Sequence, residues 1–404
     1  MAKQIGLISA IAIGLASMLG AGVFVVFHNA YAITPTGYYW ALGLAAVVAS
    51  LNAWSVYSLA RQIEQPGGIY TYARKYLNET ASFSAGFAFV FGKIGSIAAI
   101  ALAFNYYLTP QLHFWPAVGA IAVMTVVNIF GIQRTAGVAV VLAATTSVFL
   151  LTIIGAGLAT PAPAMQIAMP DATPSLQNVL SAAAVFFFAF AGYARVATLG
   201  HEVKNATTNV PRAIVISLGF VISAYFVLAY VLQKFLGLNL FTDNAPFKTA
   251  AQLLLPGMPV WITTSVAVIA SLGSLLVLLA GVSRTASLMS SQGELPAVLR
   301  IRNRHNAPWL AEVLISLGAI GLIAYGDLSW VIGFSSFSVL YYYSIGHLAT
   351  LRQPKSERVF PRALAILGFL LCWALMFTVP GPAVPISLAI LLIAHLARGV
   401  LRKQ

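Results

Sequence analysis

Charge and cysteine are both scarce in this sequence. Only 8% of its 404 residues are charged, and 60% are hydrophobic. Soluble domains carry roughly 25% charged residues, so this shortage excludes a soluble globular protein. The single cysteine, Cys372, excludes a disulfide framework and a cysteine-rich metal site.

Long apolar runs take the place of the missing charge. A membrane-spanning helix needs roughly 20 mainly apolar residues. The first run is too long for a cleavable signal peptide and lacks a convincing cleavage site. We therefore expect an all-α integral membrane protein with twelve transmembrane helices, at residues 5–31, 37–62, 82–107, 115–132, 137–158, 179–200, 212–236, 259–290, 308–325, 328–350, 361–379 and 382–401.

The distribution of basic residues predicts the topology. The net charge is +13, and most of it lies in loops after even-numbered spans, for example at Arg61, Arg134 and Arg300. Loops after odd-numbered spans hold little beyond Lys234 and Lys248. Since basic loops favour the cytoplasm, both termini are predicted to be cytoplasmic, in a bacterial inner membrane. The charge then reflects topology and contact with anionic lipid, and we expect no nucleic-acid partner.

The first span contains an interruption. Residues 14–24 read GLASMLGAGVF, with Gly20, Ala21 and Gly22 near the middle of the apolar run. Glycine weakens helical structure and lets another molecule approach the backbone closely. Freed backbone groups at this depth are tolerated only beside protein or a water-filled cavity. The pattern predicts a binding site for a small polar solute; the alternative is a close helix crossing at the two glycines.

The sixth span repeats this pattern, because its aromatic run leads to a glycine, Gly192, within the membrane. Interrupted spans at corresponding positions of two groups of five indicate an inverted-repeat transporter with its site between the two breaks. We therefore predict a first repeat at 1–158, an extracellular linker at 159–178, a second repeat at 179–350, and two further spans with a cytoplasmic tail at 351–404.

Several polar residues inside the spans are candidates for coupling or charge recognition. Lys93 lies roughly 16 Å deep in span 3, near the bilayer midplane, where a charge is expected to have a function unless it snorkels to an interface. Arg195, three residues past Gly192, is expected to meet a substrate carboxylate or Glu202, or to lie solvated in the cytoplasmic vestibule. Thr145 and Thr146 in span 5 either bond to their own helix or coordinate a cation. Residues 244–252 are predicted to form a short external helix that could cap the outer vestibule.

Four motifs occur in the order in which one known family carries them. They lie at Gly20, Gly22, Val23 and Phe24; at Gly67, Gly68 and Tyr70; at Glu202, Lys204, Asn205, Pro211, Arg212, Ala213 and Ile214; and at Ser283, Arg284, Met289, Gly293, Leu295 and Pro296. With these motifs the chain resembles the amino acid–polyamine–organocation superfamily of permeases over spans 1 to 10. Spans 11 and 12 agree only in hydropathy.

This resemblance implies a five-plus-five inverted repeat, with discontinuous spans 1 and 6 and alternating access to a central amino acid site. It implies that backbone N–H groups of Ala21, Gly22 and Val23 bind the substrate carboxylate, and that carbonyl groups at the breaks bind the ammonium. Helix ends present such donors and acceptors. The implied substrate-binding residues are Met18, Leu19, Gly20, Ala21, Gly22, Val23, Ala189, Phe190, Gly192 and Tyr193.

The chain also departs from the family pattern. Ala194, His201 and Ala206 replace residues that many members share, and residues 143–147 lack the lysine that many proton-coupled or exchanging relatives carry in span 5. The coupling ion, H⁺ or Na⁺, therefore does not follow from the resemblance. Lys93 is a candidate for the substitute charge.

The acidic residues bear on the substrate. None of the nine falls at the centre of a span, so a second positive charge on the substrate would find no partner. We predict a carrier of a neutral, apolar L-amino acid, with Phe188, Phe190 and Tyr193 around its side chain. The alternatives are a carrier of acidic amino acids or small carboxylates that uses Lys93 and Arg195, a channel, or a membrane enzyme.

An enzyme is disfavoured because the sequence carries no motif for covalent or metal catalysis. Its histidines are scattered, no cluster with Cys372 is evident, and we predict neither a metal nor a cofactor. The histidines considered are His28, His113, His201, His305 and His347.

Overall fold

The computed structural model describes residues 5–63, 65, 67–130, 135–162, 173–193, 196 and 203–401. These residues form helices and connecting loops, with one isolated bridge between Ile5 and Val203. The predicted all-helical fold is thus confirmed for the part of the chain that is described. Arg195, Ala194 and His201 lie outside it.

The helices follow the apolar runs of the sequence closely. Span 1 forms two helices, α1 (Leu7–Met18) and α2 (Ala21–Ile33). Each other predicted span overlaps one main helix, although α8 covers only residues 179–190 of the sixth span, which was predicted at 179–200. These helices are α3 (Tyr38–Ala60), α5 (Glu79–Leu108), α6 (Trp115–Ile129), α7 (Thr135–Ala159), α8 (Leu176–Phe190), α10 (Ala206–Leu236), α12 (Val260–Ser291), α13 (Trp309–Tyr325), α14 (Leu328–Arg352), α15 (Arg362–Met376) and α16 (Ala383–Leu401).

Short helices connect these elements. They are α4 (Ile69–Tyr76), η1 (Pro110–Leu112), η3 (Gly237–Phe241), α11 (Pro246–Leu254) and η4 (Ala297–Arg300). α11 lies where a short helix was predicted at 244–252, and its apolar face is buried. Between the end of α7 and the start of α8, residues 163–172 of the predicted linker lie outside the described part.

Helix length and composition fit a chain that crosses a membrane several times. α3, α5, α12, and α10 together with η3 are each long and apolar enough to span a membrane. α1 and α2 taken together also meet these criteria, with a bend of 41° between them. α6, α8, α13, α15, α16 and residues 144–159 of α7 are shorter apolar helices. The count of twelve crossings stays a prediction.

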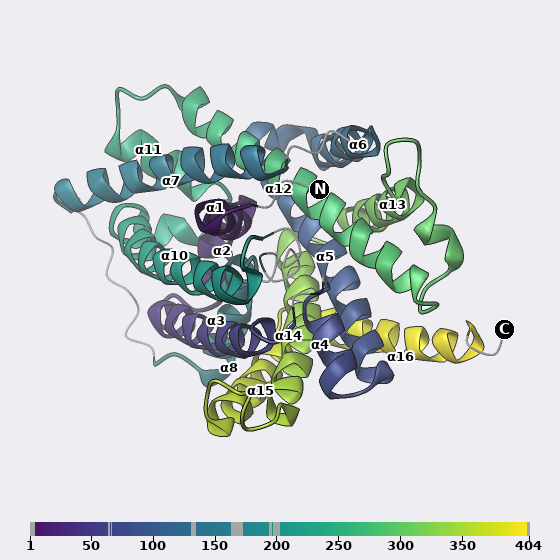
Figure 1. Cartoon of the computed structure of the whole chain (residues 1–404). Helices are drawn as coiled ribbons and strands as arrows, with labels where there is room; N and C mark the ends of the chain where they lie inside the picture. The colour runs from purple at the N-terminus through teal and green to yellow at the C-terminus, as the bar shows by residue number, and fades with distance from the viewer. Residues whose placement is uncertain are drawn as a thin grey trace.

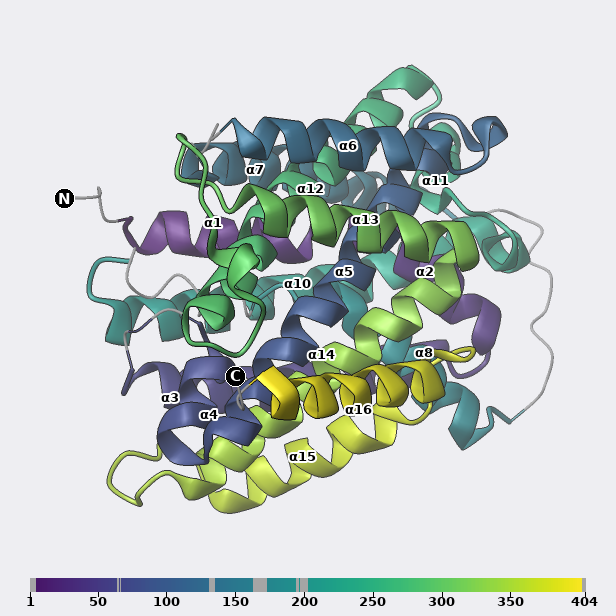
Figure 2. The same ribbon diagram turned by 90° about the vertical axis from the view of Figure 1, so that its right-hand side faces the viewer.

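α5 and α14 run obliquely through the middle of the molecule, as Figures 1 and 2 show. α5 packs against α12, α13 and α14, while α1 packs against α7 and α10 and α2 against α8. The broken span 1 is therefore enclosed by other helices, and α15 and α16 lie outside it (Figure 2).

Small residues bring α5 and α14 close together. A Cβ atom at Gly92 would collide with Ser338, and one at Gly95 would collide with Phe334. At the same crossing, the Ser96 and Ser335 hydroxyl groups lie 2.7 Å apart and hydrogen-bond. Small side chains let membrane helices pack tightly. The packing of Gly92, Gly95 and Ser96 against α14 therefore sets how α5 is oriented around Lys93.

A buried carboxylate ties together three elements at one end of the helices. The Glu294 carboxylate, just after α12, lies 2.5 Å from Arg74 Nη2 on α4 and 3.5 Å from Arg398 Nη2 on α16. The Tyr70 hydroxyl donates a hydrogen bond to it at 2.7 Å. Burial, reinforced by this carboxylate, raises the pKa of Tyr70, so the hydroxyl keeps its proton and remains a donor.

We expect Glu294→Gln to lower the free energy of unfolding by about 3 kcal/mol, because it leaves two neighbouring guanidinium groups without their counter-charge. Unfolding in mixed micelles followed by circular dichroism measures the loss. The matched control is Glu357→Gln, whose carboxylate accepts a 2.6 Å hydrogen bond from Tyr76 at a partly exposed position. Equal losses in the two variants would contradict this account.

Candidate functional site

The structure interrupts span 1 at Leu19 and Gly20. α1 ends at Met18, and the Leu19 N–H donates to the Leu15 carbonyl at 2.7 Å. Gly20 then takes an extended conformation, with φ −67° and ψ −158°, before α2 begins. A Cβ atom at Gly20 would collide with the Ser274 hydroxyl of α12. Glycine therefore serves here to let α12 approach the break.

The sixth span also stops within its apolar run. α8 ends at Phe190, the Ala191 N–H donates to the Phe187 carbonyl at 3.1 Å, and residues 191–193 form a turn. A Cβ atom at Gly192 would overlap the backbone of Ser17 and Met18. The ends of α1 and α8 thus meet directly at Gly192.

The first break presents backbone donors and acceptors. The amides of Ala21 and Gly22 are the first two of α2, and such amides have no acceptor within their own helix. The Val23 amide, predicted as a third donor, already donates to the Gly20 carbonyl at 3.3 Å. The Met18 carbonyl, predicted as an acceptor, already accepts a 2.7 Å hydrogen bond from the Tyr225 hydroxyl.

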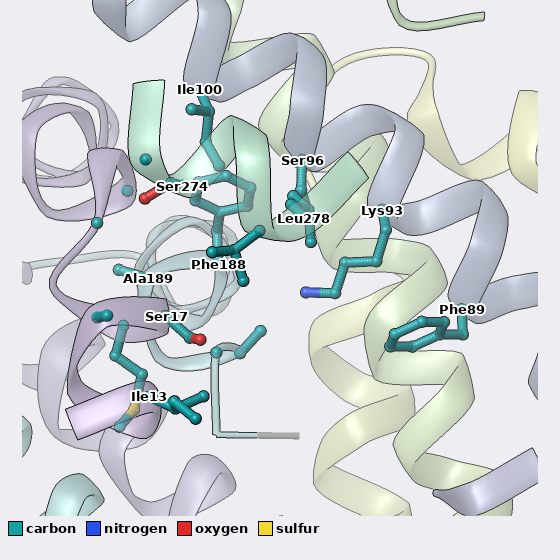
Figure 3. A pocket seen from close by; sticks show the side chains of 18 residues that line it. Ile13, Ser17, Phe89, Lys93, Ser96, Ile100, Phe188, Ala189, Ser274 and Leu278 are labelled. Atoms are coloured by element: carbon teal, nitrogen blue, oxygen red, sulfur yellow. The ribbon is translucent and has the colours of Figure 1, made fainter. Parts of the chain in front are cut away.

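A cavity of about 80 Å³ lies between the two breaks (Figure 3). A single water needs about 10–15 Å³ of such cavity volume, so the cavity has the size needed for a small solute such as an amino acid. Its described lining contains no carboxylate. It consists of Ile13, Ala16, Ser17, Met18, Gly20, Gly22, Phe89, Lys93, Ser96, Ile100, Phe188, Ala189, Ala191, Gly192, Gly273, Ser274, Val277 and Leu278.

Lys93 supplies the cationic side chain of this lining. It stands halfway along the 30-residue helix α5 and is 8% exposed. In Figure 3 its ammonium group projects from α5 into the cavity, toward the side on which Ser17 and Phe188 lie. The prediction that Lys93 faces the protein interior is therefore correct. The ammonium and the positive N-terminal end of α2 both favour an anionic group in the cavity.

The structure brings only some of the predicted residues together. Met18, Gly20, Gly22, Ala189, Gly192 and Lys93 line the cavity, as does Phe188. Leu19, Val23, Phe190 and Tyr193 are buried behind the lining. Thr145 and Thr146 lie on α7 and do not line the cavity. Arg195 lies outside the described residues.

Other lining residues were missed by the sequence analysis. α12 contributes Gly273, Ser274, Val277 and Leu278, and α5 contributes Phe89 and Ser96. In the sequence, the feature that could have indicated the contribution of α12 is the pair Gly273-Ser274, two small residues in the middle of an otherwise apolar span. Small residues of this kind occur at most helix contacts, so the pair alone did not indicate a site.

His347 and Cys372 both contact the Asn52 side chain, a proximity that the sequence did not reveal. The Asn52 side-chain oxygen lies 2.7 Å from His347 Nε2 and 3.2 Å from Cys372 Sγ. Because an amide oxygen only accepts, Nε2 and the thiol donate to it. His347 Nδ1 lies 2.7 Å from the Ser55 hydroxyl. Among the described residues no three His, Cys, Asp or Glu side chains are grouped for a metal.

An apolar helical chain with a broken helix beside a cavity is typical of membrane carriers of small solutes. A sequence model of one such family, described as "Amino acid permease", matches residues 5–396. The chain belongs to this amino acid permease family. It is an integral membrane transporter rather than an enzyme.

Three relatives illustrate the range of the family. An uncharacterized transporter of Mycobacterium tuberculosis is 37% identical over an alignment of 407 positions. The alignment covers 99% of this chain and 91% of that protein. The low-affinity putrescine importer PlaP of Escherichia coli is 25% identical, over 87% of this chain and 81% of the importer. Cationic amino acid transporter 7, chloroplastic, of Arabidopsis thaliana is 24% identical, over 85% of this chain and 64% of that protein.

Gly192→Ala is expected to reduce transport strongly and to destabilise the protein by about 1–3 kcal/mol, because the added methyl group overlaps the backbone of Ser17. Solute flux in proteoliposomes and thermal unfolding test this expectation. Gly219→Ala on α10 is the control, since a Cβ atom there meets nothing within 4 Å. A fully active Gly192→Ala protein would show that the two helix ends do not need this contact.

Proposed function

We propose that this protein is a secondary active transporter that moves a neutral, apolar L-amino acid across the bacterial inner membrane by alternating access. The observation that carries the proposal is the cavity between the helix breaks, which combines Lys93, the α2 N-terminus and apolar side chains without a described carboxylate. Twelve spans, both termini in the cytoplasm, and repeats at 1–158 and 179–350 belong to this proposal. So do the extracellular linker at 159–178 and the two further spans of 351–404.

The substrate carboxylate binds at the first break. The Ala21 and Gly22 amides have no acceptor within their own helix, and an anion at a helix N-terminus is favoured by both the donors and the helix dipole. Lys93 reaches the same cavity from α5. Of the groups in an amino acid, the carboxylate is the one that suits the α2 amides and the Lys93 ammonium.

The substrate ammonium binds at the opposite helix ends. α1 ends at Met18 and α8 at Phe190, and the last carbonyl groups of a helix have no partner within it. The Leu19 and Ala189 carbonyls belong to the same two ends. A carbonyl oxygen can accept two hydrogen bonds. The Met18 carbonyl already accepts one from Tyr225, so its second lone pair can accept one from the ammonium.

The substrate side chain lies against apolar residues. Phe89, Ile100, Phe188, Val277 and Leu278 line the cavity, and each buried methylene group of the substrate contributes about 0.8 kcal/mol. The cavity volume of about 80 Å³ favours a small or medium-sized aliphatic side chain.

A second positive charge on the substrate is disfavoured. The names of two relatives specify cationic amino acids and putrescine. In this chain the described lining offers Lys93 and no acidic residue to such a charge, and like charges in a buried site repel strongly. We infer that its substrate differs from those in the names of these two relatives.

The Lys93 ammonium also favours a second candidate, an acidic amino acid or another small carboxylate. An extra carboxylate on the substrate would pair with Lys93, while the α2 amides hold the first. Arg195, the other residue considered for this role, lies outside the described residues.

Counterflow separates these candidates. Proteoliposomes preloaded with unlabelled leucine should accelerate uptake of labelled leucine, valine or alanine, and should not accelerate uptake of arginine or putrescine. A channel gives no such acceleration. Preferred counterflow of glutamate or aspartate would support the second candidate, and preferred counterflow of arginine or putrescine would refute the proposal.

Lys93→Met should raise the KM for the amino acid about 10-fold to 100-fold, because a hydrogen bond to a charged group contributes about 1.5–3 kcal/mol. Initial uptake rates over a range of substrate concentrations measure the change. Lys248→Met on α11 removes a lysine outside the cavity lining and serves as the control. An unchanged KM in Lys93→Met would assign Lys93 a structural role.

A further inference from the structure

The described residues contain two glutamates whose side chains are almost completely buried. They are Glu294, 1% exposed, and Glu312, 0% exposed. The negative charge of Glu294 is balanced by Arg74 and Arg398, and its carboxylate also accepts a hydrogen bond from the Tyr70 hydroxyl. Glu312 has a much poorer set of partners, so the two carboxyl groups have different roles.

Glu312 accepts one hydrogen bond from a side chain. The Ser283 hydroxyl of α12 donates to Glu312 Oε1 at 3.1 Å. The other oxygen, Oε2, is buried without a hydrogen-bond partner among the described residues. An ionised carboxylate only accepts hydrogen bonds, and a buried acceptor without a donor is costly. Oε2 is therefore the position at which a proton can add.

The charges around Glu312 are few. α13 packs against α5, α6, α12, α14 and η4. The charge of Arg284 on α12 acts on Glu312, whereas two guanidinium groups and a tyrosine contact Glu294 directly. The other charged or imidazole side chains described on these elements are Glu79 and Lys93 of α5, His347 and Arg352 of α14, and Arg300 of η4.

Glu312 lies between the cavity and the predicted cytoplasmic surface. It is the fourth residue of α13, about 4.5 Å from the start of the helix, and the basic loop with Arg300, Arg302 and Arg304 precedes that start. Its partner Ser283 follows the lining residue Leu278 by five residues, about 7–8 Å along α12. One helix, α12, therefore contacts both the carboxyl group and the cavity.

We propose that Glu312 is the binding site of a coupling proton. This inference rests on the proposed function, because it assigns the ion that drives the transport cycle. A proton from water adds to Oε2 and converts the carboxylate to a carboxylic acid, which changes the charge at the contact between α12 and α13 by one unit. Since α12 carries Ser274 into the cavity, occupancy of Glu312 by a proton alters the packing of a helix that lines the substrate site.

Glu312→Gln keeps the shape of the protonated side chain and removes the titration. Two assays are run on the same proteoliposomes: accumulation of labelled leucine driven by an imposed pH gradient, and leucine counterflow without any gradient. We expect the variant to retain counterflow within about threefold of the wild type and to lose gradient-driven accumulation completely. Glu357→Gln, which changes a partly exposed carboxylate, should retain both activities.

The outcomes distinguish the two proposals. A wild-type protein without amino acid counterflow would refute the proposed function. A wild type that exchanges leucine but accumulates it only under a sodium gradient would overturn the Glu312 assignment. Gradient-driven accumulation by Glu312→Gln would overturn it as well.

A spectroscopic measurement covers the case in which Glu312→Gln does not fold. In the purified protein, infrared difference spectra across a pH titration should contain the carbonyl band of a protonated carboxyl group. Ser283→Ala removes a hydrogen bond that favours the ionised form and should move the midpoint of this band upward by about one pH unit. A spectrum without a titrating carboxyl band, or a midpoint unchanged in Ser283→Ala, would refute the proposal.

Discussion

Unpaired backbone groups in an apolar interior are the constraint on which this structure depends. The break at Leu19 and Gly20 leaves helix ends where no lipid can satisfy them. Polar contacts and close packing stabilise these helix ends. The Tyr225 hydroxyl donates to the Met18 carbonyl, and Gly192 packs against the backbone of Ser17. The first amides of α2 have no acceptor within their own helix, and we propose that the same constraint thereby provides the binding site for a substrate carboxylate.

Buried charges show three different arrangements within this one chain. Glu294 is paired with two guanidinium groups and holds three elements together. Lys93 lines the cavity, where a substrate carboxylate can join it. Glu312 has a single hydroxyl donor, and the charge of Arg284 acts on it. Because burying a charge is costly, each arrangement is expected to have its own role. We propose structural pairing for Glu294, substrate recognition for Lys93 and proton binding for Glu312.

Membership of the amino acid permease family fixes the class of protein and leaves the substrate open. The family match extends over residues 5–396, yet the names of the relatives range from cationic amino acid transporters to a putrescine importer. The difference between such substrates is one or two charges, and the few side chains around the cavity decide whether those charges find partners. Local chemistry at Lys93 and on α12 therefore carries more information about the substrate than the overall fold.

The sequence by itself determined the helices, the first break and the depth of Lys93, since apolar run length, mid-span glycines and an isolated charge are local signals. The span predicted at 328–350, for example, corresponds to α14 at Leu328–Arg352. Only the tertiary structure decided which faces of α5 and α12 line the cavity, that Asn52 joins His347 to Cys372, and that Glu312 is buried against Ser283. These contacts join residues far apart in the chain on helices that are apolar on every side, so no periodicity in the sequence marks the face that each helix turns inward.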